Sequence, residues 1–194
     1  MPMQKKMKPI TMREYHRLAM RTSPMDGHDK VDNGMLGPLG ETGELVDILK
    51  KHKYQSTPNA PWPVDRIADE LGDVLWHLEE MADGLGTTME VVSGMSFADL
   101  DTMTRAVRFP NIERAILNLS THAHNIRKAV RRKDRKTRDI QMRRMLHAAA
   151  YLARMISMPI EEVARRNIEK LMRRYPDGFS AAASMARYAK EKET

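Results

Sequence analysis

The fold of this chain is decided by two stretches of sequence, LGPLGETGELVDILKKHK (residues 36–53) and VDRIADELGDVLWHLEEM (residues 64–81). Both have the apolar spacing of amphipathic helices. The first holds Glu41 and Glu44, the second Glu70 and Asp73. Because residues three apart share a helix face, each pair points two carboxylates in one direction. Two such helices packed antiparallel would place four carboxylates around one small volume.

Four carboxylates held that close together repel one another unless cations lie between them. Hard oxygen ligands in a chain with no cysteine indicate Mg²⁺, with Mn²⁺ as the alternative. One acidic pair three residues apart is ordinary on a solvated helix face. Two pairs, each in an apolar helix with glycines beside it, favour a metal site instead. These glycines are Gly37, Gly40, Gly43 and Gly72.

Length and composition predict one all-α domain that spans residues 1–194 and buries a real core. Aromatic residues make up only 5% of the chain, whereas methionine occurs 17 times, which suits packed helices better than a β-sandwich. No apolar run approaches the roughly 18 residues of a membrane span. The basic start MPMQKKMK is not followed by the apolar stretch of a signal peptide, so we expect a cytoplasmic protein.

The sequence pattern predicts a bundle of helices and no strand. Pro and Gly clusters predict a polar loop over 23–34, a proline-rich connection over 56–63 that contains Trp62, and a break at Phe109-Pro110. Helices are expected at 11–22, 35–53, 63–83, 88–94, 97–107, 111–133, 137–156 and 159–174.

The net charge of +7 is concentrated in one segment, residues 127–144. Ten basic residues there face only Asp134 and Asp139, so the segment carries +8 and the remainder of the chain about −1. Such a stripe attracts phosphates, and nucleic-acid binding is therefore an alternative function. It is the less favoured one, because no aromatic residue lies between Phe109 and Tyr151 to stack on bases.

A degenerate internal repeat is a further hypothesis. Shifts of 80 and 74 residues lay the two acidic helices on 111–133 and 137–156. At these shifts no acidic residue lies opposite any of the four carboxylates. Glu41 and Glu44 fall opposite Thr121 and His124, and Glu70 and Asp73 fall opposite Arg144 and His147.

Four motifs resemble the MazG-like nucleoside triphosphate pyrophosphohydrolases of the all-α NTP pyrophosphatase superfamily. They are NGMLGPLGETGE (33–44) with Lys50-Lys51 after it, ELGDVLW (70–76), EEVARRNIEKL (161–171) and RYPDGF (174–179). The resemblance covers about residues 11–86 and 159–180. It departs from the family at 87–158, where about 70 residues, the basic stripe included, replace a short turn.

The resemblance implies Mg²⁺-dependent hydrolysis of a nucleoside triphosphate to the monophosphate and pyrophosphate. It implies a homodimer, unless an internal repeat replaces the partner subunit. A helical interaction module without turnover is the other alternative, and the intact acidic pairs argue against it. The metal-binding and catalytic residues would be Glu41, Glu44, Glu70 and Asp73, and the substrate-binding residues Asn33, Lys51, Asn167, Lys170, Arg174 and Tyr175.

Two neighbours of the acidic residues are interpreted as structural. His77, four positions after Asp73, could orient a metal ligand, but a half-buried or surface histidine is the favoured interpretation. Trp76 is expected in the bundle core.

Overall fold

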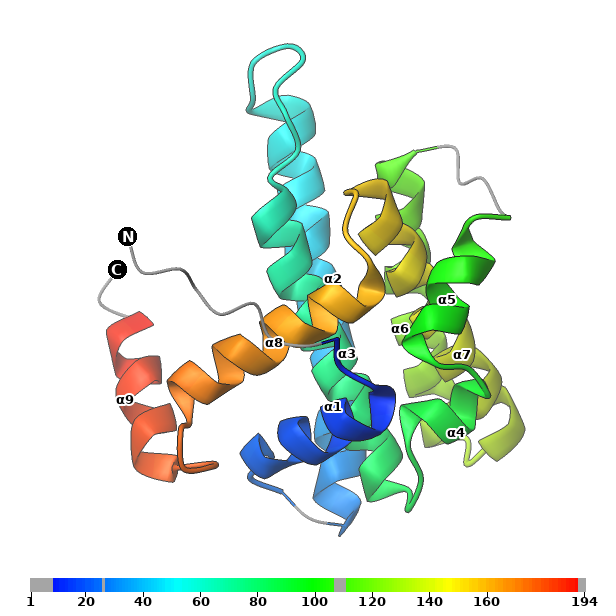
Figure 1. Ribbon diagram of the computed structural model, residues 1–194, viewed down its shortest axis with the longest axis vertical. Helices are drawn as coiled ribbons and strands as arrows, with labels where there is room; N and C mark the ends of the chain where they lie inside the picture. Colours follow the sequence, from blue (N-terminus) through cyan, green and yellow to red (C-terminus); the bar gives the residue numbers. More distant parts are fainter. Residues whose placement is uncertain (1–8, 26, 107–110, 192–194) are drawn as a thin grey trace.

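All regular structure in the computed structural model is helical over the residues that it describes, 9–25, 27–106 and 111–191 (Figure 1). This confirms the predicted all-α class. None of these helices is both long and apolar enough to cross a membrane. The elements are α1 (Met12–Ala19), η1 (Met20–Thr22), α2 (Gly27–Tyr54), α3 (Val64–Gly84), α4 (Met89–Ser93), α5 (Phe97–Thr104), α6 (Ile112–Arg131), α7 (Arg135–Met155), α8 (Ile160–Arg174) and α9 (Ala181–Glu191).

Most predicted helices are confirmed. α3, α6, α7 and α8 begin and end within two residues of the predicted bounds. Each begins after a residue that can precede a helix, such as Asn111, whose side chain accepts from the Arg114 N–H. α5 ends at Thr104, before the predicted end at 107. That predicted end and the break at Phe109-Pro110 lie outside the described residues.

The predicted loop over 23–34 is wrong in its second half, because α2 begins at Gly27. Its first turns pack against the end of α3 so closely that only glycine fits. A Cβ on Gly34 would lie 2.6 Å from the Met81 backbone nitrogen, and one on Gly84 would lie 2.7 Å from the Lys30 Cβ. Burial against α3 therefore outweighs the low helix propensity of this segment. Asn33 lies within a helix and not ahead of one.

Two helical hairpins form the body of the molecule. α2 and α3 make the first, and α6 and α7 make the second. α6 packs along α2 and α7 against α3, while α8 crosses α3 (Figure 1). This is the packing that an internal repeat requires, and the repeat itself stays a prediction. One continuous core joins the side chains of both hairpins with α8.

Two adjacent carboxylates on α3, Glu79 and Glu80, are fully buried. Glu79 lies 2.9 Å from the His16 Nδ1 of α1 and accepts from the Met89 N–H of α4. Glu80 accepts from the Ser23 hydroxyl at 2.7 Å and from the Asn33 side-chain amide at 2.6 Å. Because a buried charge is tolerated only with such partners, this pair links α3 to α1, to Ser23 after η1, to α2 and to α4.

The glycines of α2 give a paired test of the α2–α3 contact. We expect Gly34→Ala to lower the free energy of unfolding by about 1–3 kcal/mol, because the added methyl overlaps backbone atoms. Gly40→Ala should raise it by about 0.5–1 kcal/mol, because nothing lies within 4 Å of a Cβ there and alanine favours the helix. Urea unfolding followed by circular dichroism measures both changes. Equal effects of the two substitutions would contradict the close contact.

Candidate metal centre

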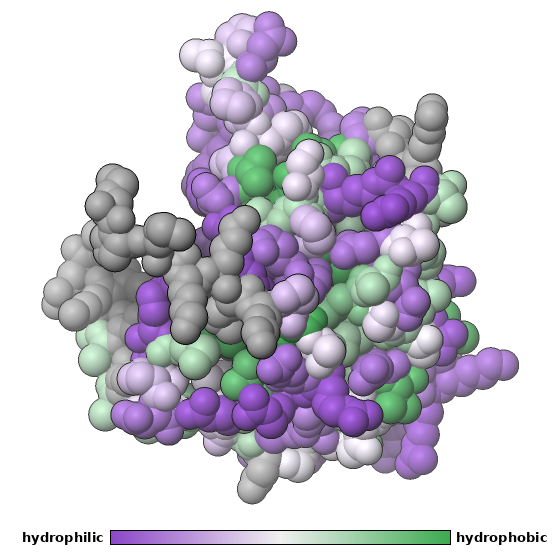
Figure 2. Space-filling model, in the orientation of Figure 1, coloured by the Kyte–Doolittle hydropathy of each residue, from purple (hydrophilic) through white to green (hydrophobic). Residues whose placement is uncertain are grey.

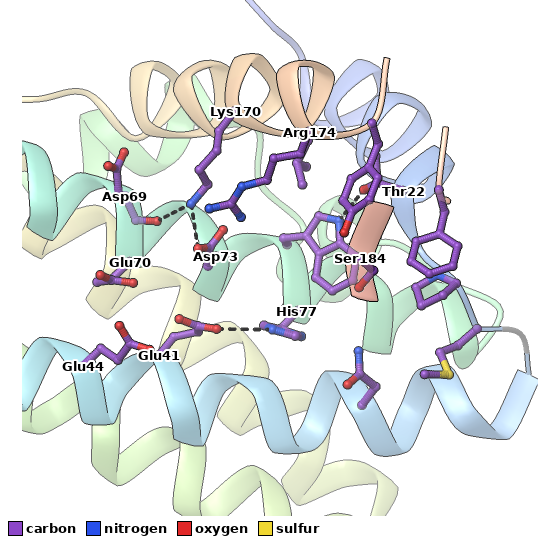
Figure 3. Close-up of a pocket in the computed structure, with 17 residues that line it drawn as sticks. Thr22, Glu41, Glu44, Asp69, Glu70, Asp73, His77, Lys170, Arg174 and Ser184 are labelled. Atoms are coloured by element: carbon purple, nitrogen blue, oxygen red, sulfur yellow. Dashed lines mark hydrogen bonds and ion pairs between the residues drawn. The ribbon is translucent and has the colours of Figure 1, made fainter. Parts of the chain in front are cut away.

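A cavity of about 690 Å³ opens between α2, α3, α8 and the segment after α8 (Figure 3). The turn after α8 closes one side of it, because the Phe179 N–H donates to the Arg21 carbonyl at 3.0 Å. Predicted site residues that line the cavity are Asn33, Glu41, Glu44, Glu70, Asp73, Lys170, Arg174 and Tyr175.

Three of the predicted carboxylates converge at one end of this cavity. Glu41 and Glu44 project from successive turns of α2 toward Glu70 on α3 (Figure 3). One oxygen of each lies within 4.8 Å of the other two. The spacing of three residues on α2 and the antiparallel packing of α3 produce this group, as the sequence predicted.

Asp73 lines the same cavity but is held by α8 instead of joining the three glutamates. Its Oδ2 accepts from the Lys170 ammonium at 2.6 Å, and its Oδ1 accepts from the Asn167 amide at 3.0 Å. Asn167 is buried and in turn accepts from the Tyr15 hydroxyl. α8 can come this near because α3 has Gly72 there, where a Cβ would lie 2.9 Å from the Asn167 Cβ.

Proximity to the other glutamates opposes the ionisation of Glu70 and of Glu44. Burial, and then the charges of Glu44 and Glu41, raise the pKa of Glu70 to about 7. Burial and then the charge of Glu41 raise the pKa of Glu44. A bound divalent cation would reverse both effects, since it stabilises the ionised carboxylates. The group therefore has the donor type and the unbalanced charge that a Mg²⁺ or Mn²⁺ ion would neutralise.

His77 lies next to this group, with its side chain only 14% exposed. Its Nε2 is 3.5 Å from Glu41 Oε1, and its Nδ1 is 3.7 Å from Glu80 Oε2. Burial alone would lower the pKa of His77, but the two carboxylates outweigh it and raise that pKa to about 9. His77 is therefore a cation at neutral pH, which partly balances Glu41 and Glu80.

Cations and aromatic rings line the rest of the cavity. Arg174 points into it from the last turn of α8 (Figure 3) and makes no ion pair within the described part of the chain. Trp76, Tyr175 and Phe179 also line it, and the rings of the latter two are 5.7 Å apart. Lys51, by contrast, does not line the cavity; it pairs with Asp47 at 2.7 Å on the outside of α2.

Sequence reasoning missed the contribution of Trp76 and His77 to the cavity wall. Trp76 packs against the core, as expected, but it also lines the cavity, and its indole N–H donates to the Thr22 hydroxyl at 3.0 Å. It follows Asp73 by three positions, so the same helical spacing that paired the acidic residues could have placed it on their face. Trp62, the other tryptophan, lies in the α2–α3 connection as predicted and stacks on His52.

Comparison of the chain with protein-family models, with curated proteins and with solved structures found no match.

The raised pKa of Glu70 predicts a pH-dependent cost of folding without metal. Between pH 4.5 and 7 the carboxyl ionises in the unfolded chain but resists ionisation in the folded one, so stability falls as the pH rises through this range. Glu70→Gln removes that cost. We expect the thermal midpoint of the variant to exceed that of the wild type above pH 7, and this advantage to vanish below pH 4.5.

Differential scanning calorimetry in EDTA across this pH range measures the difference. Asp69→Asn, an exposed neighbour on the rim, is the matched control for the removal of one carboxylate. A pH-independent gain in Glu70→Gln would show that the three carboxylates do not interact as described.

Proposed function

We propose that this protein hydrolyses a nucleoside triphosphate to the monophosphate and pyrophosphate with the help of Mg²⁺. The observation that carries the proposal is the convergence of Glu41, Glu44 and Glu70 opposite the cations of α8 in one open cavity. The resemblance of the surrounding motifs to the MazG-like enzymes supports it.

The acidic end of the cavity suits a metal-bound triphosphate. Glu41, Glu44 and Glu70 would hold the ion, with Asp73 adjacent. When bound, Mg²⁺ would neutralise phosphate oxygens and favour attack at phosphorus. Lys170 and Arg174 lie one turn apart on α8 and would bind the outer phosphates, Arg174 through two parallel N–H donors.

Hydrolysis needs a water aligned with the α-phosphorus and an acceptor for its proton. The bond that forms joins the water oxygen to the α-phosphorus, and the bond that breaks joins that phosphorus to the bridging oxygen, which leaves with pyrophosphate. One of the three glutamates accepts the proton, since they are the bases beside the proposed metal ion. Positioning and charge neutralisation provide most of the rate enhancement in such reactions.

The other end of the cavity suits a nucleoside. Trp76, Tyr175 and Phe179 line it there, and Asn33 and Thr22 add polar groups. Rings of this kind bind a base by stacking and apolar contact. The Asn33 amide already donates to Glu80, so its carbonyl oxygen is the group that can accept from a base or sugar.

We also propose that one chain supplies the whole helical bundle. In the resembled family two subunits build it, whereas here α6 and α7 pack on α2 and α3 of the same chain. Their counterparts of Glu70 and Asp73 in the repeat alignment, Arg144 and His147, cannot form a second acidic group. One metal centre per chain follows.

Removing a metal ligand should abolish the reaction. We expect Glu41→Gln, Glu44→Gln, Glu70→Gln and Asp73→Asn each to lower pyrophosphate release by about 100-fold or more, because each loses a charge that the cation or α8 requires. A panel of ordinary and modified triphosphates with Mg²⁺ would serve as substrates. Lys51→Gln, outside the cavity, is the control and should retain activity. Wild-type turnover in any two of the acidic variants would rule out the assignment.

The position of cleavage gives an independent check. The first products should be a nucleoside monophosphate and pyrophosphate. In the proposed binding mode Lys170 and Arg174 bind the outer phosphates, and the metal held by the three glutamates lies at the α–β linkage. Chromatography of early time points, with inorganic pyrophosphatase omitted, detects them. Orthophosphate together with a diphosphate at early times would mean attack at the γ-phosphate and a different reaction.

A further inference from the structure

A second charged region lies at the turn between α6 and α7, away from the candidate metal centre. Long hydrophilic side chains project from the lower right edge of the molecule in Figure 2, where this turn lies in Figure 1. We call it the basic turn surface. Its exposed members are Lys128, Arg131, Arg132, Lys133, Arg135, Lys136, Arg143 and Arg144, with Arg127 and Arg138 half-buried beside them.

Most of this charge is not neutralised within the protein. Arg138 pairs with Asp139 at 2.8 Å, and Arg143 donates to the Val92 carbonyl. The one other carboxylate of the segment, Asp134, accepts from the Thr137 N–H and caps α7. No ion pair joins the remaining cations to any carboxylate of the described residues. The surface therefore offers a cluster of cations to an external anion.

Lys133 occupies the tip of the turn in a conformation that a side chain rarely adopts. Its φ is +57°, and the hydrogen bonds from Lys133 and Asp134 to Val130 and Ala129 are those of a Schellman helix end, where glycine is the favoured residue. The turn after α3 is built in the same way and does have glycine, Gly86. Lysine at 133 thus adds a cation to the tip of the turn, although its backbone conformation is less favourable for lysine than for glycine.

The basic turn surface borders a hollow of about 400 Å³ that is separate from the metal centre. The start of α2, the end of α3 and the turn line it, with Lys133, Arg135 and Arg138 among the lining residues. It shares no residue with the cavity of the three glutamates. Gly84 on its wall lies 14 residues after Glu70 on one helix, which corresponds to about 21 Å.

We propose that the basic turn surface binds the phosphate backbone of double-stranded nucleic acid. Eight exposed cations exceed what one small anion can use, whereas a duplex presents phosphates continuously. The absence of aromatic residues from the segment removes the stacking on which single-strand binding depends. Attachment to a membrane surface usually adds Trp, Phe or Leu to the cations, and residues 127–144 contain none of these. This inference does not rest on the proposed hydrolase activity.

The salt dependence of binding tests the proposal. Fluorescence anisotropy of a labelled 20-base-pair duplex measures the association constant. We expect its logarithm to fall linearly with the logarithm of the NaCl concentration. Each neutralised phosphate contributes about 0.9 to that slope. The triple variant Arg131→Gln, Arg132→Gln, Lys136→Gln should therefore reduce the slope by about 2.7 and weaken binding by up to about 500-fold at 0.1 M salt.

A second triple variant controls for net charge. Arg13→Gln, Arg17→Gln, Arg114→Gln removes three exposed cations elsewhere on the molecule and should leave the slope nearly unchanged. Equal losses in both triple variants would overturn the proposal, because they would reflect overall charge alone. So would the absence of duplex binding by the wild type at 0.1 M salt, or binding to vesicles of anionic phospholipid without binding to the duplex.

Lys133→Gly separates binding from folding. Glycine relieves the backbone at this turn, so the thermal midpoint should not fall, while the loss of one cation should weaken duplex binding up to about eightfold at 0.1 M salt. Ser157→Gly is the matched control, because Ser157 (φ +59°) ends α7 in the same way at its opposite end. It should leave binding unchanged. If the affinity and the salt slope of Lys133→Gly equal those of the wild type, Lys133 does not contact phosphate, and its part in the proposed surface is contradicted.

Discussion

The close antiparallel contact between α2 and α3 is the constraint on which the rest of this structure depends. It holds oxygens of Glu41, Glu44 and Glu70 within 4.8 Å of one another, although their charges oppose it. Apolar burial along the same two helices must supply the compensating free energy, and Gly34 permits the approach where any larger residue would strike the Met81 backbone. An acidic group that a cation would stabilise is thus built by packing and not by mutual attraction.

Charge on both sides limits how far this repulsion spreads. Lys170 from α8 neutralises Asp73, and His77 lies as a cation between Glu41 and the buried Glu80. Of the three glutamates, Glu44 and Glu70 are therefore left without an ion pair among the described residues, whereas Glu41 faces His77. Asp73 does not join the three glutamates, because Lys170 donates to one of its oxygens and Asn167 to the other.

The sequence predicted what depends on short-range spacing and missed what depends on distant contacts. Apolar periodicity located α3, α6, α7 and α8, and the three-residue spacing located the acidic group. The first turns of α2 were predicted to be a loop because glycine, aspartate and asparagine are poor helix formers. The burial of Val31 and Gly34 against α3 outweighs that low propensity. The motif predicted Lys51 to be a substrate ligand. Lys51 lies two helical turns beyond Glu44, however, so it is outside the cavity and pairs with Asp47.

The hydrogen bond from Phe179 to Arg21 joins two turns that are 158 residues apart and closes one side of the cavity. During synthesis on the ribosome, α2 and α3 can pair, and the two hairpins can pack, while this wall is still missing. The carboxylates can therefore be brought together before this wall of the cavity exists. In a nascent chain this side of the cavity would close only after Phe179 emerges, so the order of translation would separate folding of the bundle from completion of the cavity.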